Sequence, residues 1–208
     1  MITLYWSPQT RAVRALWMLE EVGADYQVQA VDIRATPRND PADFLAASPQ
    51  GKVPALIDGE VKMADSAAMA LYLADRYRPG ELAPRADDPA RGEFLYWLLY
   101  SPATIEPAMM EKFVKLDVES QSSPWGNFDD MVSVLEKRLD GRTWVAADRF
   151  TMADLMLAGS IQFMVQFDML QPGPVLKNYM DRCLARGAAQ RAQQRDGQET
   201  ARMGAASA

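Results

Sequence analysis

Groups with complementary chemistry lie close together in one short stretch of the chain. Lys52 supplies a cation, Asp65 a carboxylate and Ser66 a hydroxyl. Val53 adds backbone groups that regular strand pairing is expected to leave unused, because Pro54 has no N–H to donate and is tolerated mainly at a sheet edge or in a cis turn. A zwitterionic peptide needs such a set of partners. The stretch therefore indicates a binding site for a small peptide.

The local sequence predicts how these groups are held. Gln50-Gly51-Lys52 is a polar turn that leads into the apolar run 53–57, and Asp58-Gly59 between two extendable runs is typical of a β-hairpin. The helix formers from Ala67 to Tyr77 follow an acid and a serine, either of which can cap that helix. Because the N–H groups at a helix start bind anions, we expect this helix to present an anion site.

Further hydroxyls lie near the start of the chain. Residues 2–6 form an apolar run typical of a buried strand, which stops at Ser7-Pro8. Serine followed by proline is the expected N-cap and first residue of a helix, which Gly23 would end. Ser7 therefore offers a hydroxyl at the positive end of a helix, where an anion is stabilised. Thr10 and Tyr5 are the other candidate hydroxyls in this region.

The order of elements predicts an α/β domain followed by helices. Residues 24–33 alternate as a second strand, and with one short helix, the hairpin and its closing helix they give the order βαβαββα over residues 1–78. This is the thioredoxin-like order. The composition of residues 79–88 predicts a linker, and residues 89–208 are expected to form an all-helical domain.

Within that helical domain, several boundaries can be predicted. Pro102 and Pro107 should bend or break the long helix that starts near Pro89. Thr151 and Asp154 have the spacing of a capping box, and the helix after them is apolar nearly all round, as expected of a central buried helix. We expect the final dozen residues to be frayed or disordered.

Composition excludes several classes of function. The 208-residue chain has a net charge of −6 and a pI near 4.8, so phosphate backbones should repel it and a nucleic acid is not expected as partner. It has no histidine, which excludes an imidazole base or a histidine metal ligand, and no metal is expected. No long apolar run and no signal-peptide pattern occur, so we expect no membrane segment and a cytoplasmic location.

Three motifs, in this order along the chain, resemble the glutathione S-transferase family. The spacing Ser-Pro-x-x-x-x-Val-Arg from Ser7 through Arg14 resembles serine-type members such as the plant tau class. Gln-Gly-Lys-Val-Pro, a hairpin and an acid-serine pair resemble the glutathione-binding half, although the family's usual acid is glutamate rather than Asp65. The box after Phe150 resembles that of the family's second domain. The chain thus resembles a cytosolic, serine-type bacterial member.

The resemblance implies glutathione as co-substrate and Ser7 as the group that activates its thiol. Thr10 would take this role if the helix began later, and Tyr5 ranks last because classes that use such a tyrosine have a longer loop after it. Arg38 is a weaker candidate for contact with the ligand. The glutathione-binding positions carried over from the family are Gln50, Lys52, Val53, Pro54, Asp65 and Ser66.

The resemblance also implies a second substrate, a small hydrophobic electrophile, and a homodimer. Tyr96, Tyr100 and Thr104 form one stripe at helical spacing that could bind the electrophile, or whose rings could pack inside the helix bundle or at a dimer interface. Two functions remain open on the sequence alone. One is a glutathione transferase, and the alternative is a non-catalytic relative that keeps the fold as an interaction or regulatory module.

Overall fold

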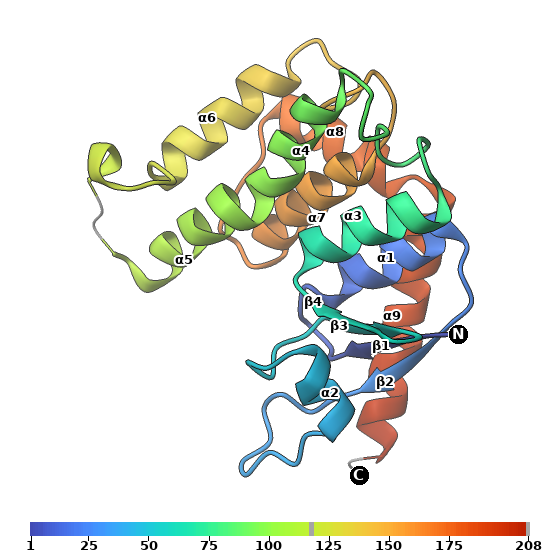
Figure 1. The fold of residues 1–208 in the computed structure, drawn as a ribbon. Helices are drawn as coiled ribbons and strands as arrows, with labels where there is room; N and C mark the ends of the chain where they lie inside the picture. Colours follow the sequence, from blue (N-terminus) through green and yellow to red (C-terminus); the bar gives the residue numbers. More distant parts are fainter. Residues whose placement is uncertain (117–118, 207–208) are drawn as a thin grey trace. The chain divides into compact units, whose positions relative to one another are not determined.

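The computed structural model describes residues 1–116 and 119–206, which form two compact units (Figure 1). Met1–Tyr77 and Arg186–Ala208 make up the first unit, and Arg78–Ala185 the second.

A four-stranded mixed sheet forms the centre of the first unit, in the order β2-β1-β3-β4. β1 (Ile2–Trp6) pairs in parallel with β2 (Tyr26–Ala30) and antiparallel with β3 (Ala55–Asp58), which pairs antiparallel with β4 (Val61–Ala64). Gly59 in the hairpin turn has a φ of 61°, a conformation that glycine adopts without steric cost. The predicted hairpin and the thioredoxin-like order are both confirmed.

Helices cover both faces of this sheet. α1 (Ala12–Val22) and α3 (Ser66–Tyr77) pack against each other, and α2 (Ala42–Ala47) packs on β3 and β4 (Figure 1). β1 is buried along nearly its whole length because it lies inside the sheet and is covered on both faces. Its end at Trp6 therefore has a fixed place in the unit.

The prediction that Ser7 caps the first helix is wrong. α1 begins at Ala12, and Gln9 has a φ of 56°, in the left-handed region, so the helix cannot extend back through it. The Thr10 hydroxyl donates to the Ser7 carbonyl at 2.7 Å and accepts from the Ala12 N–H at 3.2 Å. Thr10 thus provides the local bonding at the helix start that we had expected from Ser7.

The prediction that the final dozen residues are frayed is wrong as far as residue 206, because the chain forms the helix α9 (Gly187–Ala206) there. Its buried alanines pack against α1, so we find residues 186–208 grouped with the first unit, whereas we had expected them in the helical domain. Glu199, only 6% exposed, forms ion pairs with Arg195 at 2.8 Å and Arg202 at 3.0 Å. The small side chains that bring α9 close are Ala188, Ala189 and Ala192.

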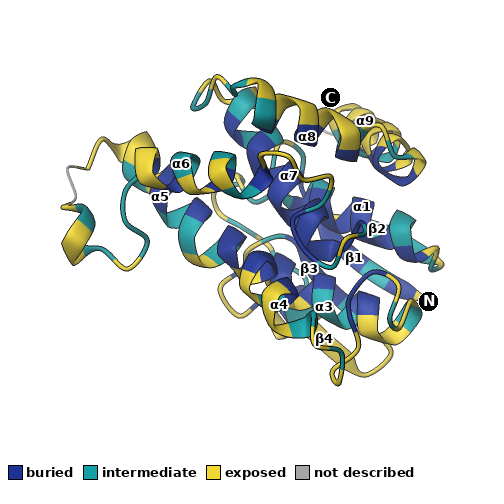
Figure 2. Ribbon diagram, turned by 90° about the horizontal axis from the view of Figure 1, so that it is seen from above, coloured by how far each residue is buried: buried dark blue, intermediate teal, exposed yellow. Residues whose placement is uncertain are grey.

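The second unit is helical, and α7 is its most buried helix (Figure 2). The predicted breaks in the long helix are present, because a π-helical turn over Ser101–Ile105 contains Pro102, and Pro107 lies in the first turn of the next helix. No helix in the described ranges is long and apolar enough to cross a membrane. The helices are α4 (Arg91–Tyr100), α5 (Glu106–Val114), α6 (Phe128–Leu139), α7 (Met152–Gln166) and α8 (Pro174–Leu184).

The predicted capping box is present at the start of α7, and its acid, Asp154, also binds groups outside this helix. Asp154 is fully buried and accepts from the N–H groups of Thr151 and Val145, both at 2.8 Å. The hydroxyls of Thr151 (3.0 Å) and Tyr179 (2.9 Å) also donate to it. Burial raises the pKa of Asp154, and these hydrogen bonds oppose that rise. One carboxylate thus ties the start of α7 to α8 and to the preceding loop.

A second acid joins the hairpin to α3 in the first unit. Asp58 accepts from the hydroxyls of Tyr72 (2.9 Å) and Tyr77 (2.7 Å) and pairs with Arg76 at 3.2 Å. Burial alone would raise the pKa of Asp58, but the bonds from the two tyrosines and the nearby Arg76 outweigh it and lower the pKa below its ordinary value. The ionised form of Asp58 therefore stabilises the folded chain.

We predict that Asp58→Asn destabilises the protein by about 1–2 kcal/mol at neutral pH. Because the folded pKa is lowered, the contribution of the carboxylate is present above its unfolded pKa of about 4 and is lost as pH falls through the folded value. Urea unfolding of both proteins should show a difference that shrinks below about pH 4. Asp43→Asn, at an exposed carboxylate with one ion pair to Lys62, is the control; a difference for Asp58→Asn that is constant with pH would contradict the prediction.

Candidate functional site

The register of the sheet brings the predicted residues to one edge. The ladder between β1 and β3 ends at the pair Tyr5↔Ala55, so Ser7 and Val53 both lie two residues beyond it. The ladder between β3 and β4 ends at Ala55↔Ala64, so Ser66 lies two residues beyond it on the other side. Antiparallel neighbours end at the same edge of a sheet. Three segments distant in sequence therefore meet there, with β3 between the other two.

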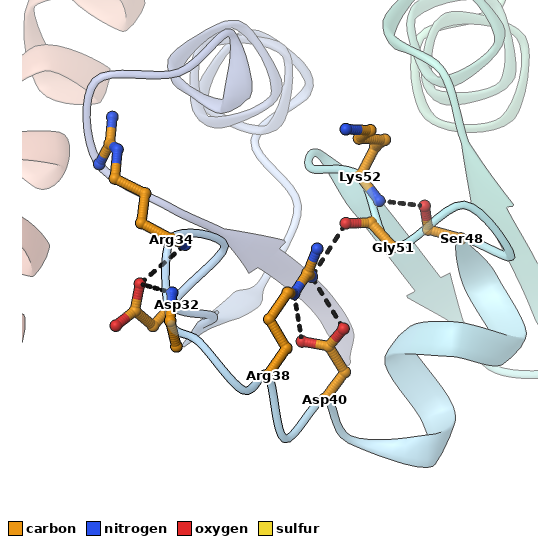
Figure 3. A network of polar contacts seen from close by, with 8 residues as sticks. Asp32, Arg34, Arg38, Asp40, Ser48, Gly51 and Lys52 are labelled. Carbon is orange, nitrogen blue, oxygen red and sulfur yellow. Dashed lines mark hydrogen bonds and ion pairs between the residues drawn. The ribbon is translucent and has the colours of Figure 1, made fainter.

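The loop before β3 is held by Ser48 and by Arg38, which the sequence had pointed to only as a weaker candidate for contact with the ligand. The Ser48 hydroxyl accepts from the Lys52 N–H at 2.9 Å, and the Ser48 carbonyl accepts from the Gly51 N–H at 2.8 Å. Arg38 donates to the Gly51 carbonyl at 3.0 Å (Figure 3). The side chain of Lys52 is not used in this loop and is exposed, so its ammonium can meet a ligand carboxylate.

Arg38 acts on this loop rather than extending into solvent. Its guanidinium forms an ion pair with Asp40 at 2.8 Å, and the two side chains are 28% and 12% exposed. Gly51 has a φ of 62°, and a Cβ built there would lie 3.3 Å from Nη2 of Arg38. Any other residue would be strained by this backbone angle, and its Cβ would push the Arg38 guanidinium slightly away. Asp40 and Ser48 had no signal in the sequence, because their partners are fixed by the folded loop.

Val53 presents its backbone outside the sheet ladder. The Val53–Pro54 peptide bond is cis, and β3 starts only at Ala55. In the described ranges, the loop and turn hydrogen bonds use neither the N–H nor the carbonyl of Val53. A backbone with an open donor and acceptor next to the start of a strand can pair with the backbone of a peptide. Pro54 itself is buried, and Gln50 is exposed at the start of the loop.

The acid-serine pair opens α3 as predicted. Oδ1 of Asp65 accepts from the N–H groups of Ala67 at 2.9 Å and Ala68 at 3.1 Å, which makes Asp65 the cap. Asp65 is exposed and has a φ of 75°, a left-handed conformation uncommon for a residue with a side chain. Ser66 follows at the first helical position and is 9% exposed. A carboxylate, a hydroxyl and the positive end of a helix therefore meet at this point.

The three candidate hydroxyls near β1 differ in their packing and in their hydrogen bonds. Tyr5 is 3% exposed and packs against Phe44 at 5.2 Å between ring centroids; burial and then the charge of Asp43 raise its pKa. Thr10 already donates its hydroxyl hydrogen to the Ser7 carbonyl. The Ser7 hydroxyl has no hydrogen-bond partner in the described part of the chain, and the residue is 1% exposed. Of the three, Thr10 is the hydroxyl whose hydrogen is engaged within the described residues, and Ser7 is the one that lies beyond the end of β1, beside the start of β3.

The residues predicted to bind an electrophile lie in the second unit. Tyr96 is 58% exposed, whereas Tyr100 is 7% exposed, and both rings contact Trp97 at 5.1 Å between centroids. Burial and then the neighbouring Tyr96 raise the pKa of Tyr100 to about 12. Thr104 is half-buried in the π-helical turn. The sequence did not single out Trp97, which joins the two tyrosines into one aromatic cluster.

Comparison with known proteins places the chain in a family. The model of the glutathione S-transferase N-terminal domain matches residues 6–76, and that of the C-terminal domain matches residues 125–182. Glutathione S-transferase F9 of Arabidopsis thaliana is 30% identical over 187 residues, which cover 80% of this chain and 79% of that protein. The chain therefore belongs to the glutathione S-transferase family.

Solved structures agree with this assignment. A glutathione transferase from Methylococcus capsulatus has a TM-score of 0.79 and 26% identity, covering 95% of this chain and 99% of that chain. A glutathione transferase family member from Pseudomonas fluorescens, solved with two glutathione molecules bound, has a TM-score of 0.73 and 27% identity, covering 92% of this chain and 91% of that chain. The predicted fold class and family are thus confirmed.

We predict that Arg38→Ala weakens glutathione binding about fivefold or more, since the loop that orients Lys52 and Val53 loses its clamp on the Gly51 carbonyl. Calorimetric titration with glutathione measures the change. Arg34→Ala is the matched control, because it removes the same charge from the same surface loop without touching Gly51. An equal loss in both variants would show that only the charge of the loop matters.

Proposed function

We propose that this chain is a glutathione transferase in which Ser7 activates the thiol of glutathione for attack on a small hydrophobic electrophile. The observation that carries the proposal is the contrast between the hydroxyls near β1. Thr10 donates its hydrogen to the Ser7 carbonyl, and the Tyr5 ring packs on Phe44 in the hydrophobic cluster of the first unit. The Ser7 hydroxyl has no partner among the described residues, and Ser7 lies at the sheet edge beside the start of β3. A serine-type member of the family is the assignment that this contrast favours.

The chemical task of such a site is to ionise a thiol. A free thiol has a pKa of about 8.5, so roughly 3% is thiolate at neutral pH, and the thiolate is the nucleophile. A hydroxyl that donates to the sulfur stabilises the anion. A shift of about two units corresponds to about 2.7 kcal/mol and makes the thiolate the major form. Its electron pair then forms the bond to the electrophilic carbon, while any leaving group departs with the pair of the broken bond.

Recognition of glutathione follows from charge and from register. Lys52 would bind the glycyl carboxylate, Asp65 the γ-glutamyl ammonium and Ser66 the γ-glutamyl carboxylate at the start of α3. The backbone of Val53 would pair with the cysteinyl amide. Asp65 is suited to two tasks, because Oδ1 caps the helix and the second oxygen remains for the ammonium. Gln50 would contact one end of the ligand, and Pro54 holds the strand start in place.

The remaining parts of the proposal concern the second unit and assembly. Tyr96, Tyr100 and Thr104 would contact the electrophile, and a homodimer would cover apolar side chains that α4 exposes. Leu99 is 50% exposed and Tyr96 58% exposed, which supports a partner for this helix. A detoxifying, cytoplasmic enzyme is consistent with these features.

Ser7→Ala removes a hydrogen-bond donor to the thiolate. It is expected to lower turnover with a model electrophile by roughly 10-fold to 1000-fold, as is typical when a donor to an anion is removed. The loss should be largest near pH 6.5 and smaller at high pH, where free glutathione ionises without help. A pH–rate profile of both proteins provides the measurement.

Thr10→Ala serves as the comparison for this experiment. It removes the bond to the Ser7 carbonyl and so should lower the free energy of unfolding, while the thiol pKa of bound glutathione should change less than in Ser7→Ala. Equal loss at every pH in Ser7→Ala, or a loss confined to Thr10→Ala, would refute the role of Ser7.

Ser66→Ala should weaken glutathione binding by about 1–3 kcal/mol, because a charge-assisted hydrogen bond to a carboxylate is removed. The helix start should survive, since its cap is Asp65 rather than Ser66. Calorimetry gives the affinity, and Ser122→Ala, at an exposed serine in the second unit, is the control. Unchanged affinity in Ser66→Ala would place the γ-glutamyl group elsewhere, and absence of binding in the wild type would favour a non-catalytic module.

A further inference from the structure

Trp6 is the last residue of β1 and directly precedes Ser7. Its side chain is fully buried, and its indole N–H donates to Oδ1 of Asp196 at 2.8 Å. A buried indole has one donor and needs one acceptor, and a residue 190 positions further along the chain supplies it here. The orientation of Trp6, and with it the end of β1, is therefore fixed from the last helix.

The same helix and the residue directly before it also contact the last turn of α1. Arg186, which precedes α9, donates twice to Glu21, at 2.7 and 2.8 Å, and Arg191 of α9 pairs with Glu20 at 2.7 Å. Both glutamates belong to the last turn of α1. Figure 1 shows α9 running beside α1. α9 therefore contacts both β1, which precedes Ser7, and α1, which follows it.

Asp196 is partly buried, and partial burial disfavours an ionised carboxylate unless a hydrogen bond compensates. Burial raises its pKa, and the bond from Trp6 only partly offsets this. We propose that Asp196 is a positioning residue for Ser7, acting through the indole of Trp6 on the strand end that carries the serine. This inference rests on the proposed function of Ser7 and adds a residue of α9 to it.

The test is Asp196→Ala in the full chain. With bound glutathione, the thiol pKa, read from the ultraviolet absorbance of the thiolate, should rise by roughly half a unit, which corresponds to about threefold less thiolate at low pH. The kcat/KM near pH 6.5 should fall about threefold. The calorimetric Kd for glutathione should stay unchanged when it is measured at a pH well below the thiol pKa of the bound peptide, where the thiol is protonated both free and bound, because Lys52, Val53 and Ser66 lie on other elements.

Two further variants separate positioning from general damage. Asp196→Asn keeps an oxygen that accepts from Trp6, so it should restore the wild-type thiol pKa and rate. Glu199→Ala removes a different carboxylate of α9, which is buried and pairs with Arg195 and Arg202. It should lower the melting temperature without moving the thiol pKa.

Each outcome decides between the two proposals. If the wild type leaves the thiol pKa at the value of free glutathione, the role of Ser7 and that of Asp196 both fall. If the wild type lowers it and Asp196→Ala does the same, only the positioning role falls. If Glu199→Ala shifts the thiol pKa as much as Asp196→Ala, loosening of α9 explains the effect and the positioning role is rejected.

Discussion

The antiparallel placement of β3 between β1 and β4 is the constraint on which the candidate site depends. Because β3 runs opposite to both neighbours, its start lies beside the end of β1 and the end of β4. Ser7, Val53 and Ser66 follow or precede those ends by two residues. A shift of register by one residue would turn their side chains to the opposite face. The buried faces of the sheet prevent such a shift, so the core also sets the geometry of the site.

Around this edge, hydrogen bonds within the chain occupy several polar groups, while the groups proposed to bind glutathione have no such partner among the described residues. Arg38 and Ser48 form hydrogen bonds with backbone groups of the loop before β3, and one oxygen of Asp65 accepts from the backbone at the start of α3. Thr10 donates to the carbonyl of Ser7 in the segment between β1 and α1. The groups left over are a cation, a strand backbone, a hydroxyl and a helix start, which together match a peptide that carries both charges.

The two units use buried acids for a related purpose. Asp154 collects its donors from the loop before α7, from the start of α7 and from α8, and Asp58 joins the hairpin to the end of α3. In each case a carboxylate ties together elements that are separate in sequence, and removing one partner leaves buried polar groups unsatisfied. α9 extends this pattern to the end of the chain, where Asp196 reaches Trp6.

The sequence alone determined the order of strands and helices, the hairpin at Asp58-Gly59, a helix start capped by Asp65 or Ser66 and the breaks at the two prolines, because each depends on a few neighbouring residues with strong local preferences. It also pointed to the residues of the peptide site through their spacing. Only the tertiary structure decided that α1 starts at Ala12, that Arg38 clamps Gly51 and that α9 is an ordered helix packed on α1. The sequence of α9 has little hydrophobic character of its own, and its stability comes from buried alanines and ion pairs with residues far away in the chain, which no local pattern can reveal.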